Sequence, residues 1–125
     1  MNRRQQGSAW EQKAESWLKR RGLTPLERNV HFRGGELDLI MQDGDCLVFV
    51  EVRSRDRDNT VSAVESIGWQ KRQRLWRAAQ LYLARHPQLA AQRCRFDVVA
   101  ITTGGWRAKI DWIQDALRAD QLGSH

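Results

Sequence analysis

Residues 33–55 (RGGELDLIMQDGDCLVFVEVRSR) constrain the fold more than any other segment of the chain. Asp43-Gly44-Asp45 is typical of a tight turn, and apolar residues alternate or run continuously on both sides of it. The almost wholly apolar run at 47–52 is typical of a strand that is covered on both faces. The segment therefore predicts a β-hairpin whose second strand is buried.

The predicted hairpin brings two carboxylates, Asp38 and Glu51, together on the sheet, because side chains alternate along each strand. With a two-residue loop at 44–45, Asp38 lies directly opposite Glu51. With a loop at 43–44, Asp38 faces Phe49, and Glu51 is its diagonal neighbour on the same face. A three-residue loop with a bulge would leave the pairing open.

Two neighbouring carboxylates on an apolar sheet need an explanation, since they repel each other and lose their hydration. A hard divalent cation held by oxygen atoms offsets both costs, so the pair is a candidate metal site. A simpler alternative is that Glu51 forms an ion pair with Arg53 or Arg55 at the exposed end of the strand, since buried acids are rare unless they are paired.

The chain is basic: 21 Lys and Arg residues against 15 Asp and Glu residues give a net charge of +6. Most of the basic residues are arginines, whose forked guanidinium donates two hydrogen bonds to a phosphate. This composition favours a nucleic-acid partner without requiring one.

The length of 125 residues predicts a single domain. No apolar run is long enough to span a membrane, and the N-terminus MNRRQQGSAW lacks the apolar core of a signal peptide. We therefore expect a cytoplasmic protein with no membrane partner. Three histidines, far apart and without companion cysteines, argue against a zinc site.

The remaining signals predict the order α-β-β-β-α-β-β, a mixed sheet flanked by helices in one domain at 8–120. A flexible basic tail at 1–7 precedes the domain. The predicted elements are a helix at 8–21, an edge strand at 24–32, the hairpin, a surface loop at 54–68, a helix at 68–85, strands at 95–101 and 106–110, and a short helix at 111–119.

Glu11 admits two roles. Ser8 and Glu11 satisfy the spacing of a capping box, which would start the first helix at Ser8. Capping does not exclude a second role for the Glu11 carboxylate at the surface of the sheet.

The second helix carries several basic residues in its first half, where they oppose the helix macrodipole and do not serve helix stability. They form either a solvated charged face or a phosphate-binding face. The six tryptophans also have two possible roles. We expect most of them to pack in the core, and one or two could stack on nucleic-acid bases. The basic residues are Lys71, Arg72, Arg74 and Arg77, and the tryptophans are at positions 10, 17, 69, 76, 106 and 112.

The candidate acids form an ordered set: a helix-borne Glu11, then Gly-Glu-Leu-Asp-Leu at 35–39, then Val-Glu-Val and a basic residue at 50–53. This order is similar to the core of restriction-endonuclease-like nucleases. More narrowly, residues 7–116 resemble the YraN family, small bacterial proteins of uncertain function related to archaeal Holliday junction resolvases. That resemblance also rests on Gly7, Ala14, Leu18, Gly22, Asn29, Arg33-Gly34, Ile40, Val48-Phe49, Lys71, Leu75 and Arg95-Phe96-Asp97-Val98-Val99.

The resemblance implies an α/β, restriction-endonuclease-like fold and a metal-dependent endonuclease that acts on branched or single-stranded DNA. It implies that Asp38 and Glu51 ligate one or two Mg²⁺ (or Mn²⁺) ions, with Glu11 as a third carboxylate. The metal would polarise the scissile phosphate, help to ionise the attacking water and stabilise the leaving oxygen. Resolvases act as two-fold dimers, so a homodimer is expected if that analogy holds.

Arg53 stands where the nuclease pattern has a lysine. Arginine stays protonated and cannot act as a general base, although it can neutralise charge in the transition state. Lys71, or Gln70, at the start of the second helix is an alternative group to act on the phosphate. The predicted catalytic residues are Asp38, Glu51, Arg53 and Glu11, and the predicted nucleic-acid-binding residues are Arg33, Arg53, Arg55, Lys71, Arg72 and Arg74.

Three functions follow from these patterns. The first is a metal-dependent endonuclease acting on DNA. The second, favoured by Arg53, is a nucleic-acid-binding relative that has kept the fold and lost hydrolysis. The third is a protein-interaction module in which the hairpin acids serve structure only, because a fold by itself does not imply a function.

Overall fold

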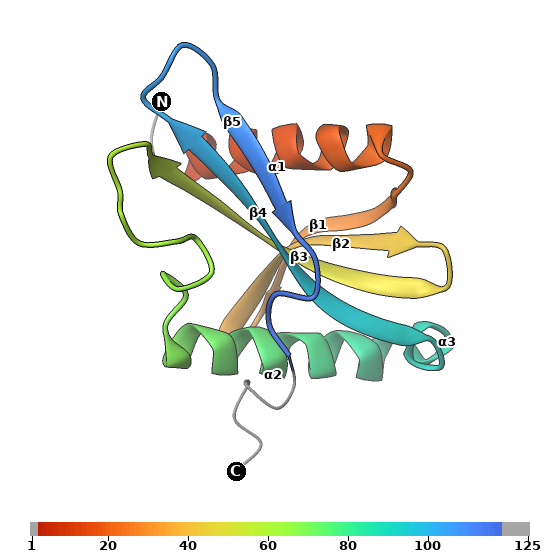
Figure 1. Ribbon diagram of the computed structural model, residues 1–125. Coiled ribbons are helices and arrows are strands. Elements are labelled where there is room, and N and C mark those ends of the chain that lie inside the picture. Colours follow the sequence, from red (N-terminus) through yellow and green to blue (C-terminus); the bar gives the residue numbers. More distant parts are fainter. Residues whose placement is uncertain (1–2, 119–125) are drawn as a thin grey trace.

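The computed structural model describes the backbone of residues 3–118 and the side chains of residues 9–118. Its elements follow the order α-β-β-β-α-α-β-β (Figure 1). The helices are α1 (Arg3–Arg20), α2 (Trp69–Arg85) and α3 (Pro87–Ala90), and the strands are β1 (Thr24–Phe32), β2 (Gly35–Asp43), β3 (Cys46–Asp56), β4 (Arg93–Thr103) and β5 (Lys109–Ile113).

The five strands form one sheet in the order β1-β2-β3-β4-β5. Neighbours are antiparallel except β3 and β4, which are parallel. Parallel neighbours need a long crossover connection, and the segment that contains α2 supplies it. The predicted edge strand at 24–32 and the predicted second helix are confirmed, and the fold is mixed α/β with a mostly antiparallel sheet.

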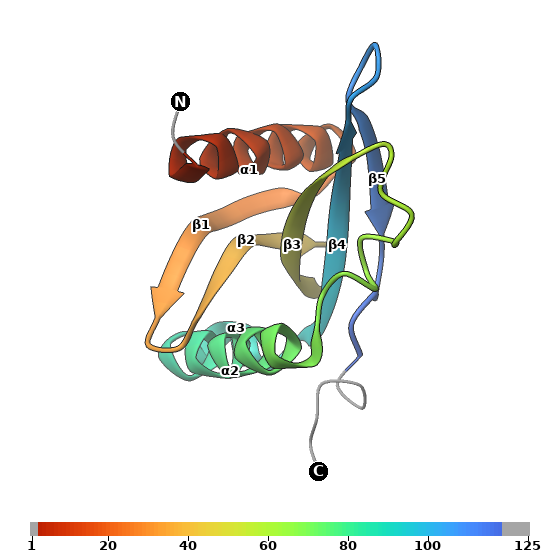
Figure 2. The same ribbon diagram turned by 90° about the vertical axis from the view of Figure 1, so that its left-hand side faces the viewer.

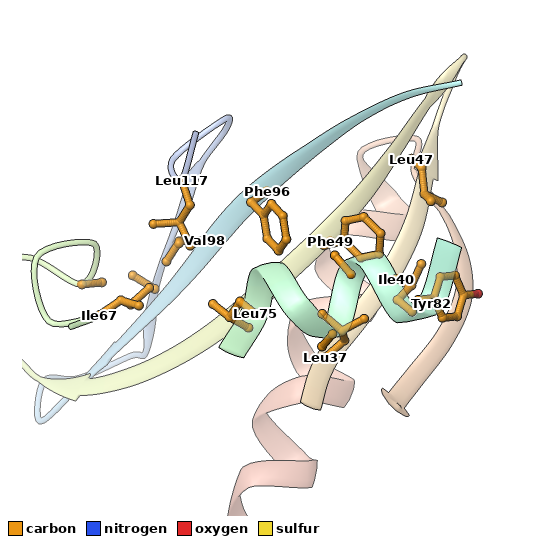
Figure 3. Packing of buried hydrophobic residues seen from close by; sticks show 14 residues of the cluster. Leu37, Ile40, Leu47, Phe49, Ile67, Leu75, Tyr82, Phe96, Val98 and Leu117 are labelled. Carbon is orange, nitrogen blue, oxygen red and sulfur yellow. The ribbon is translucent and has the colours of Figure 1, made fainter. Parts of the chain in front are cut away.

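The sheet is covered on both faces, by α1 on one side and by α2 on the other (Figures 1 and 2). The α1 side buries a cluster that includes Ala14 and Leu18. On the α2 side, Leu75 and Tyr82 belong to a second cluster with Phe49 of β3 (Figure 3). Burying one large apolar side chain contributes about 1.5–3 kcal/mol to stability. Coverage on both faces explains why β3 lacks alternation between apolar and polar residues.

The N-terminal helix is longer than its sequence signals indicate. α1 begins at Arg3, so Ser8 lies inside the helix and the prediction of a capping box at the helix start is wrong. The added residues are mainly Arg and Gln, which are good helix formers. Residues 3–7, predicted as part of a tail, therefore belong to α1, and residues 1–2 lie outside the described part of the chain.

The C-terminal part of the chain also differs from what the sequence predicts. The last strand begins at Lys109, and the predicted helix after it is wrong as far as residue 118, because strand and turn occupy its place. The buried Asp97 supplies the physical reason. Its Oδ2 accepts a hydrogen bond from Trp112 Nε1 at 2.9 Å, and its Oδ1 accepts one from Asp115 N at 2.8 Å. Residues 119–125 lie outside the described part of the chain.

Four tryptophans pack partly against the two clusters, as expected, whereas Trp69 and Trp106 are exposed. Trp69, the first residue of α2, has 61% of its surface exposed. No helix in the described part of the chain is long and apolar enough to cross a lipid bilayer.

Candidate active site

The hairpin turns through a two-residue loop at 44–45, because Asp43 pairs with Cys46. This confirms the first of the two registers, in which Asp38 and Glu51 are opposite each other. The Gly and Asp of the loop are residues that tight hairpin turns favour, but Asp43-Gly44 is favoured too, so the pairing of whole strands decides between the two registers.

The backbone pairing of β2 with β3 ends one step before the two acids, at Leu39 opposite Val50. Beyond that point, Asp38 Oδ2 accepts a hydrogen bond from Val52 N at 2.9 Å. A side-chain carboxylate thus takes the place that a backbone carbonyl has in a regular ladder. The regular ladder gives way to this side-chain contact at the position where the acids lie.

Asn29 marks an irregularity in β1 at the same level of the sheet. Its φ of 55° lies in the left-handed region, which asparagine enters more readily than most residues. Its chain neighbours pair with Leu37 and Leu39, so Asn29 lies opposite Asp38. Leu37 and Leu39 join the clusters on opposite faces of the sheet, although regular alternation would place them on one face. β2 therefore departs from a regular strand at Asp38.

The acids line a cavity of about 400 Å³, to which α1, β2, β3 and α2 all contribute residues. Figure 2 shows the two helices on either side of these strands. The cavity brings together all four predicted catalytic residues and adds Lys71 from α2. Its charged residues are Glu11, Glu36, Asp38, Glu51, Arg53 and Lys71.

Glu51 is enclosed, with 5% of its surface exposed. Its Oε2 atom lies 3.6 Å from Lys71 Nζ and 3.7 Å from Arg53 Nε. Burial raises the pKa of Glu51 well above its usual value, the Asp38 carboxyl group raises it further, and the two cations offset only part of this rise. Glu51 Oε1 and Arg53 Nε are both buried without a hydrogen-bond partner among the described residues. The ion pair with Arg53 therefore accounts for one carboxylate oxygen only.

Glu11 reaches the cavity from α1. Burial, then the charges of Asp38 and Glu36, raise its pKa from 4.5 to about 7, while a hydrogen bond with Asn29 and the charge of Arg28 act in the opposite direction. Its Oε2 atom is buried and has no hydrogen-bond partner in the described part of the molecule. Glu11 therefore lies at the surface of the sheet, as its second predicted role requires.

These carboxylates suit a divalent cation. It would bind the oxygens that lack a hydrogen-bond partner and stabilise the charged carboxylates against the burial and the mutual repulsion that raise both pKa values. Within the described residues, no group of three or more His, Cys, Asp or Glu side chains is arranged to hold one ion. Mg²⁺ commonly takes one or two carboxylates and completes its shell with water and phosphate oxygens. Asp38 and Glu51 are the two that fit, with Glu11 beside them on the cavity wall.

The predicted phosphate-binding residues fall into two groups. In the first group, Arg53 and Lys71 line the acid cavity, and Arg74 lines a neighbouring hollow together with Lys71. Arg33 is exposed in the turn between β1 and β2. Gln70, the alternative to Lys71, is exposed and lines a different hollow, so it is not brought to the acids.

In the second group, Arg55 and Arg72 bind the loop at 57–68. Arg72 donates hydrogen bonds from Nε to Ile67 O at 2.8 Å and from Nη2 to Val64 O at 2.9 Å. Arg55 Nη2 donates one to Asn59 O at 2.9 Å. The alternative ion pair between Glu51 and Arg55 is absent from the described contacts, and both arginines serve the loop.

Two residues at this site are not among those predicted. Glu36 lines the cavity, and its alternation with Asp38 along β2 is the signal that identifies it. Asn29 hydrogen-bonds Glu11 from β1. No local pattern distinguishes Asn29 from an ordinary strand or loop asparagine, because its role follows from where α1 packs on the sheet.

Residues 10–101 match the model of the uncharacterised protein family UPF0102. The chain belongs to this family. UPF0102 protein XCV0816 of Xanthomonas euvesicatoria is 49% identical over 118 residues, which are 94% of this chain and 95% of that protein. A UPF0102 protein of Xylella fastidiosa strain 9a5c is 51% identical over 120 residues, 96% of this chain and 98% of that protein. The span matched by the UPF0102 model contains every residue that lines the acid cavity.

Proposed function

We propose that this UPF0102 protein is a metal-dependent endonuclease-like protein that hydrolyses phosphodiester bonds in DNA. One observation carries the proposal: two complementary groups in one cavity, Glu51 Oε1 and Arg53 Nε, are buried without a hydrogen-bond partner among the described residues, and Arg53 Nε has only the ion pair with Glu51 Oε2 at 3.7 Å. Folded proteins seldom leave buried polar groups unpaired. A cation next to an anionic phosphate would satisfy both groups, since the cation binds the carboxylate and a phosphate oxygen accepts from the guanidinium.

The order of the elements supports a restriction-endonuclease-like fold. A helix, three antiparallel strands, a crossover helix and a strand parallel to β3 follow one another along the chain. The acids expected from the resemblance come from α1, β2 and β3, which meet at the cavity. The proposal thus draws on both the resemblance and the position of the acids.

Asp38 and Glu51 would hold Mg²⁺ or Mn²⁺, with Glu11 near them. When bound, such a metal supplies a Lewis acid for the phosphate and lowers the pKa of a water molecule. The Glu11 carboxyl group, with a pKa of about 7, exchanges its proton near neutral pH and is suited to accept one from water.

Lys71 supplies the amine that the nuclease pattern places two residues after the glutamate. Its Nζ atom is as close to Glu51 Oε2, at 3.6 Å, as Arg53 Nε is, at 3.7 Å. The ammonium group of Lys71 donates hydrogen bonds to a phosphate or a water, and Arg53 neutralises charge on the phosphate oxygens. In this proposal, Lys71 of α2 and Arg53 of β3 together perform the functions that the nuclease pattern assigns to a single lysine.

The start of α2 adds a further attraction for an anion. Gly68, at the N-cap of α2, lines the cavity and has no side chain to cap the helix. The first N–H groups of a helix lack intrahelical acceptors and carry a partial positive charge, so they attract phosphate.

The proposal is tested with labelled single-stranded, flap and four-way-junction DNA in Mg²⁺ or Mn²⁺, with products separated on denaturing gels. We expect the wild-type protein to cleave, and Asp38→Asn and Glu51→Gln to abolish cleavage. Lys71→Met should lower the rate by about 10²–10³-fold, the usual cost of removing one hydrogen-bond donor that stabilises the transition state. Asp111→Asn and Glu65→Gln, two exposed acids outside the cavity, are matched controls and should cleave normally.

Two results would count against the assignment. Cleavage that survives both Asp38→Asn and Glu51→Gln would show that the site is elsewhere. Salt-sensitive DNA binding without cleavage would support the second candidate, a binding relative that has lost hydrolysis. The specific observation in favour of that candidate is Arg53, which cannot act as a base.

A further inference from the structure

α2 carries a row of cations that begins beside Glu51, at Lys71, and continues onto the exposed surface of the helix. Lys71, Arg74 and Arg77 recur at every third residue of the helix. Neither Arg74 nor Arg77 forms an ion pair with any side chain that the structure describes. Trp69, the first residue of the helix, leaves 61% of its surface exposed. We call these four residues the α2 strip.

The α2 strip is continuous with the acid cavity. Lys71 lines both that cavity and the hollow next to it. Arg74 lines this hollow and a third one, which Trp69 and Arg77 also line. The third hollow has a volume of about 440 Å³. Sites for small molecules measure about 300–1,000 Å³, so it has room for one nucleotide.

A glycine turn between β1 and β2 holds α2 against the sheet beside the acids. A Cβ atom at Gly35 would lie 2.7 Å from the carbonyl oxygen of Arg74, so this close contact requires glycine. Gly34, with φ of +88°, faces the guanidinium of Arg77, and a Cβ there would lie 3.8 Å from its Nη1. The two glycines therefore allow α2 to pack closely at Arg74 and Arg77. Because Gly34 has no side chain, it leaves the hollow beside Arg77 open.

The spacing of the cations suits a nucleic-acid backbone. Three residues of α-helix advance by about 4.5 Å along the axis, since each residue rises by ~1.5 Å. Phosphates of one strand in duplex DNA are about 3.4 Å apart along its axis, and an extended strand spaces them more widely. Successive cations of the α2 strip can therefore contact successive phosphates.

Building on the proposed nuclease function, we propose that the α2 strip binds the single-stranded part of a DNA substrate next to the scissile phosphate. Lys71, Arg74 and Arg77 contact the phosphates, and one base stacks on the indole of Trp69. Stacking on an indole needs a free base face, which bases inside a duplex do not offer. A basic groove combined with an aromatic platform is the usual way to bind single strands.

Fluorescence anisotropy in EDTA, which prevents cleavage, measures the binding of a labelled single-stranded DNA oligonucleotide, of its blunt duplex and of an RNA strand of the same sequence. Trp69→Ala should weaken binding of the single strand by roughly 5- to 150-fold, the range that stacking of one base accounts for. Trp69→Phe should restore most of that affinity. Arg77→Ala should weaken binding and reduce the log–log salt slope by about 0.7.

The matched controls are Trp106→Ala and Arg107→Ala, two exposed residues in the turn between β4 and β5. Both should bind the single strand as the wild-type protein does. Because Trp69 is exposed, its alanine variant should keep the wild-type melting temperature, which separates lost binding from lost folding.

Equal binding of the single strand by Trp69→Ala and wild type would overturn the inference, as would duplex binding as tight as single-strand binding. Tighter binding of the RNA strand through the same residues would overturn the assignment to DNA. Failure of the nuclease proposal looks different. In that case Trp69→Ala loses single-strand binding while no metal supports cleavage. Suppose that Asp38→Asn abolishes cleavage but Trp69→Ala binds the single strand as tightly as the wild type. The nuclease proposal would then stand, and the proposal that the α2 strip binds single-stranded DNA would be wrong.

Discussion

Replacing Glu11 with glutamine tests the electrostatics of the acid cavity directly. The pKa of Glu11 is about 7 instead of 4.5, first because of burial and then because of the charges of Asp38 and Glu36. Between these two pH values the folded protein binds more protons at Glu11 than the unfolded chain does. The stability contributed by the neutral carboxyl group is therefore complete below pH 4.5 and is lost as the pH rises through about 7.

The size of the effect follows from the pKa change. A rise from 4.5 to about 7 corresponds to about 3.4 kcal/mol, at ~1.36 kcal/mol per pKa unit. The Glu11 side chain is only partly buried, so screening by solvent reduces this to about 1–2 kcal/mol. Glutamine carries no charge and keeps an oxygen for Asn29. Above pH 7, Glu11→Gln should therefore be more stable than the wild type, with a melting temperature about 3–8 °C higher.

The assay is thermal unfolding followed by circular dichroism across the acidic and neutral range, in EDTA. The quantity to compare is the difference in unfolding free energy between variant and wild type, which removes the contribution of all other titrating groups. Glu65→Gln, in an exposed loop, is the matched control and should stay within about 0.5 kcal/mol of the wild type at every pH.

Equal stability of Glu11→Gln and wild type across this range would refute the reasoning, and so would a less stable variant above pH 7. Added Mg²⁺ provides an independent check. A cation that binds only the folded state raises the melting temperature by mass action, and it should stabilise the wild type more than the variant.

Two further predictions concern contacts that stabilise the fold. Gly35→Ala should lower the unfolding free energy by about 1–3 kcal/mol, because its Cβ would collide with the backbone of Arg74, whereas Gly105→Ala meets only ordinary contacts and should not. Urea denaturation measures both, and equal midpoints would contradict the close contact. Asp97→Asn should cost about 1.5–3 kcal/mol in the same assay, since it removes the charge of one of the two carboxylates that pair with Arg95, at 3.0 Å, while Asp43 remains at 2.8 Å. A loss below about 1 kcal/mol would contradict this role.

Local sequence signals account for much of the fold. The Asp-Gly-Asp turn predicts the hairpin and brings Asp38 and Glu51 together in either two-residue register, and the structure selects the loop at 44–45. The second helix ends as predicted, before His86-Pro87, because the residue that precedes a proline avoids the helical conformation. These features depend on residues that are close together along the chain, so the sequence alone is sufficient to identify them.

The C-terminal end of the described chain is different, because contacts between distant residues decide it. The segment after β5 is held by the buried carboxylate of Asp97, which accepts a hydrogen bond from Asp115 N at 2.8 Å, and the backbone N–H of Ala116, which donates to Phe96 O at 2.8 Å. Nothing in the local pattern of residues 111–118 encodes these partners. At the N-terminal end, α1 begins at Arg3, ahead of the predicted start at Ser8, so the capping box is not used, and the added residues are mainly Arg and Gln, which are good helix formers.

The sequence by itself determined the acids of the hairpin, their presence on one face of the sheet and the basic character of α2, and it limited the hairpin to a small set of registers. Only the tertiary structure decided that Lys71 lies beside Glu51, that Arg72 is bound to a loop, and that Trp69 is left exposed. The physical reason is that alternation and turn chemistry act over a few residues. The environment of a side chain depends instead on how whole elements pack, and here the contact between Gly35 and α2 brings an amine from one element to a carboxylate of another.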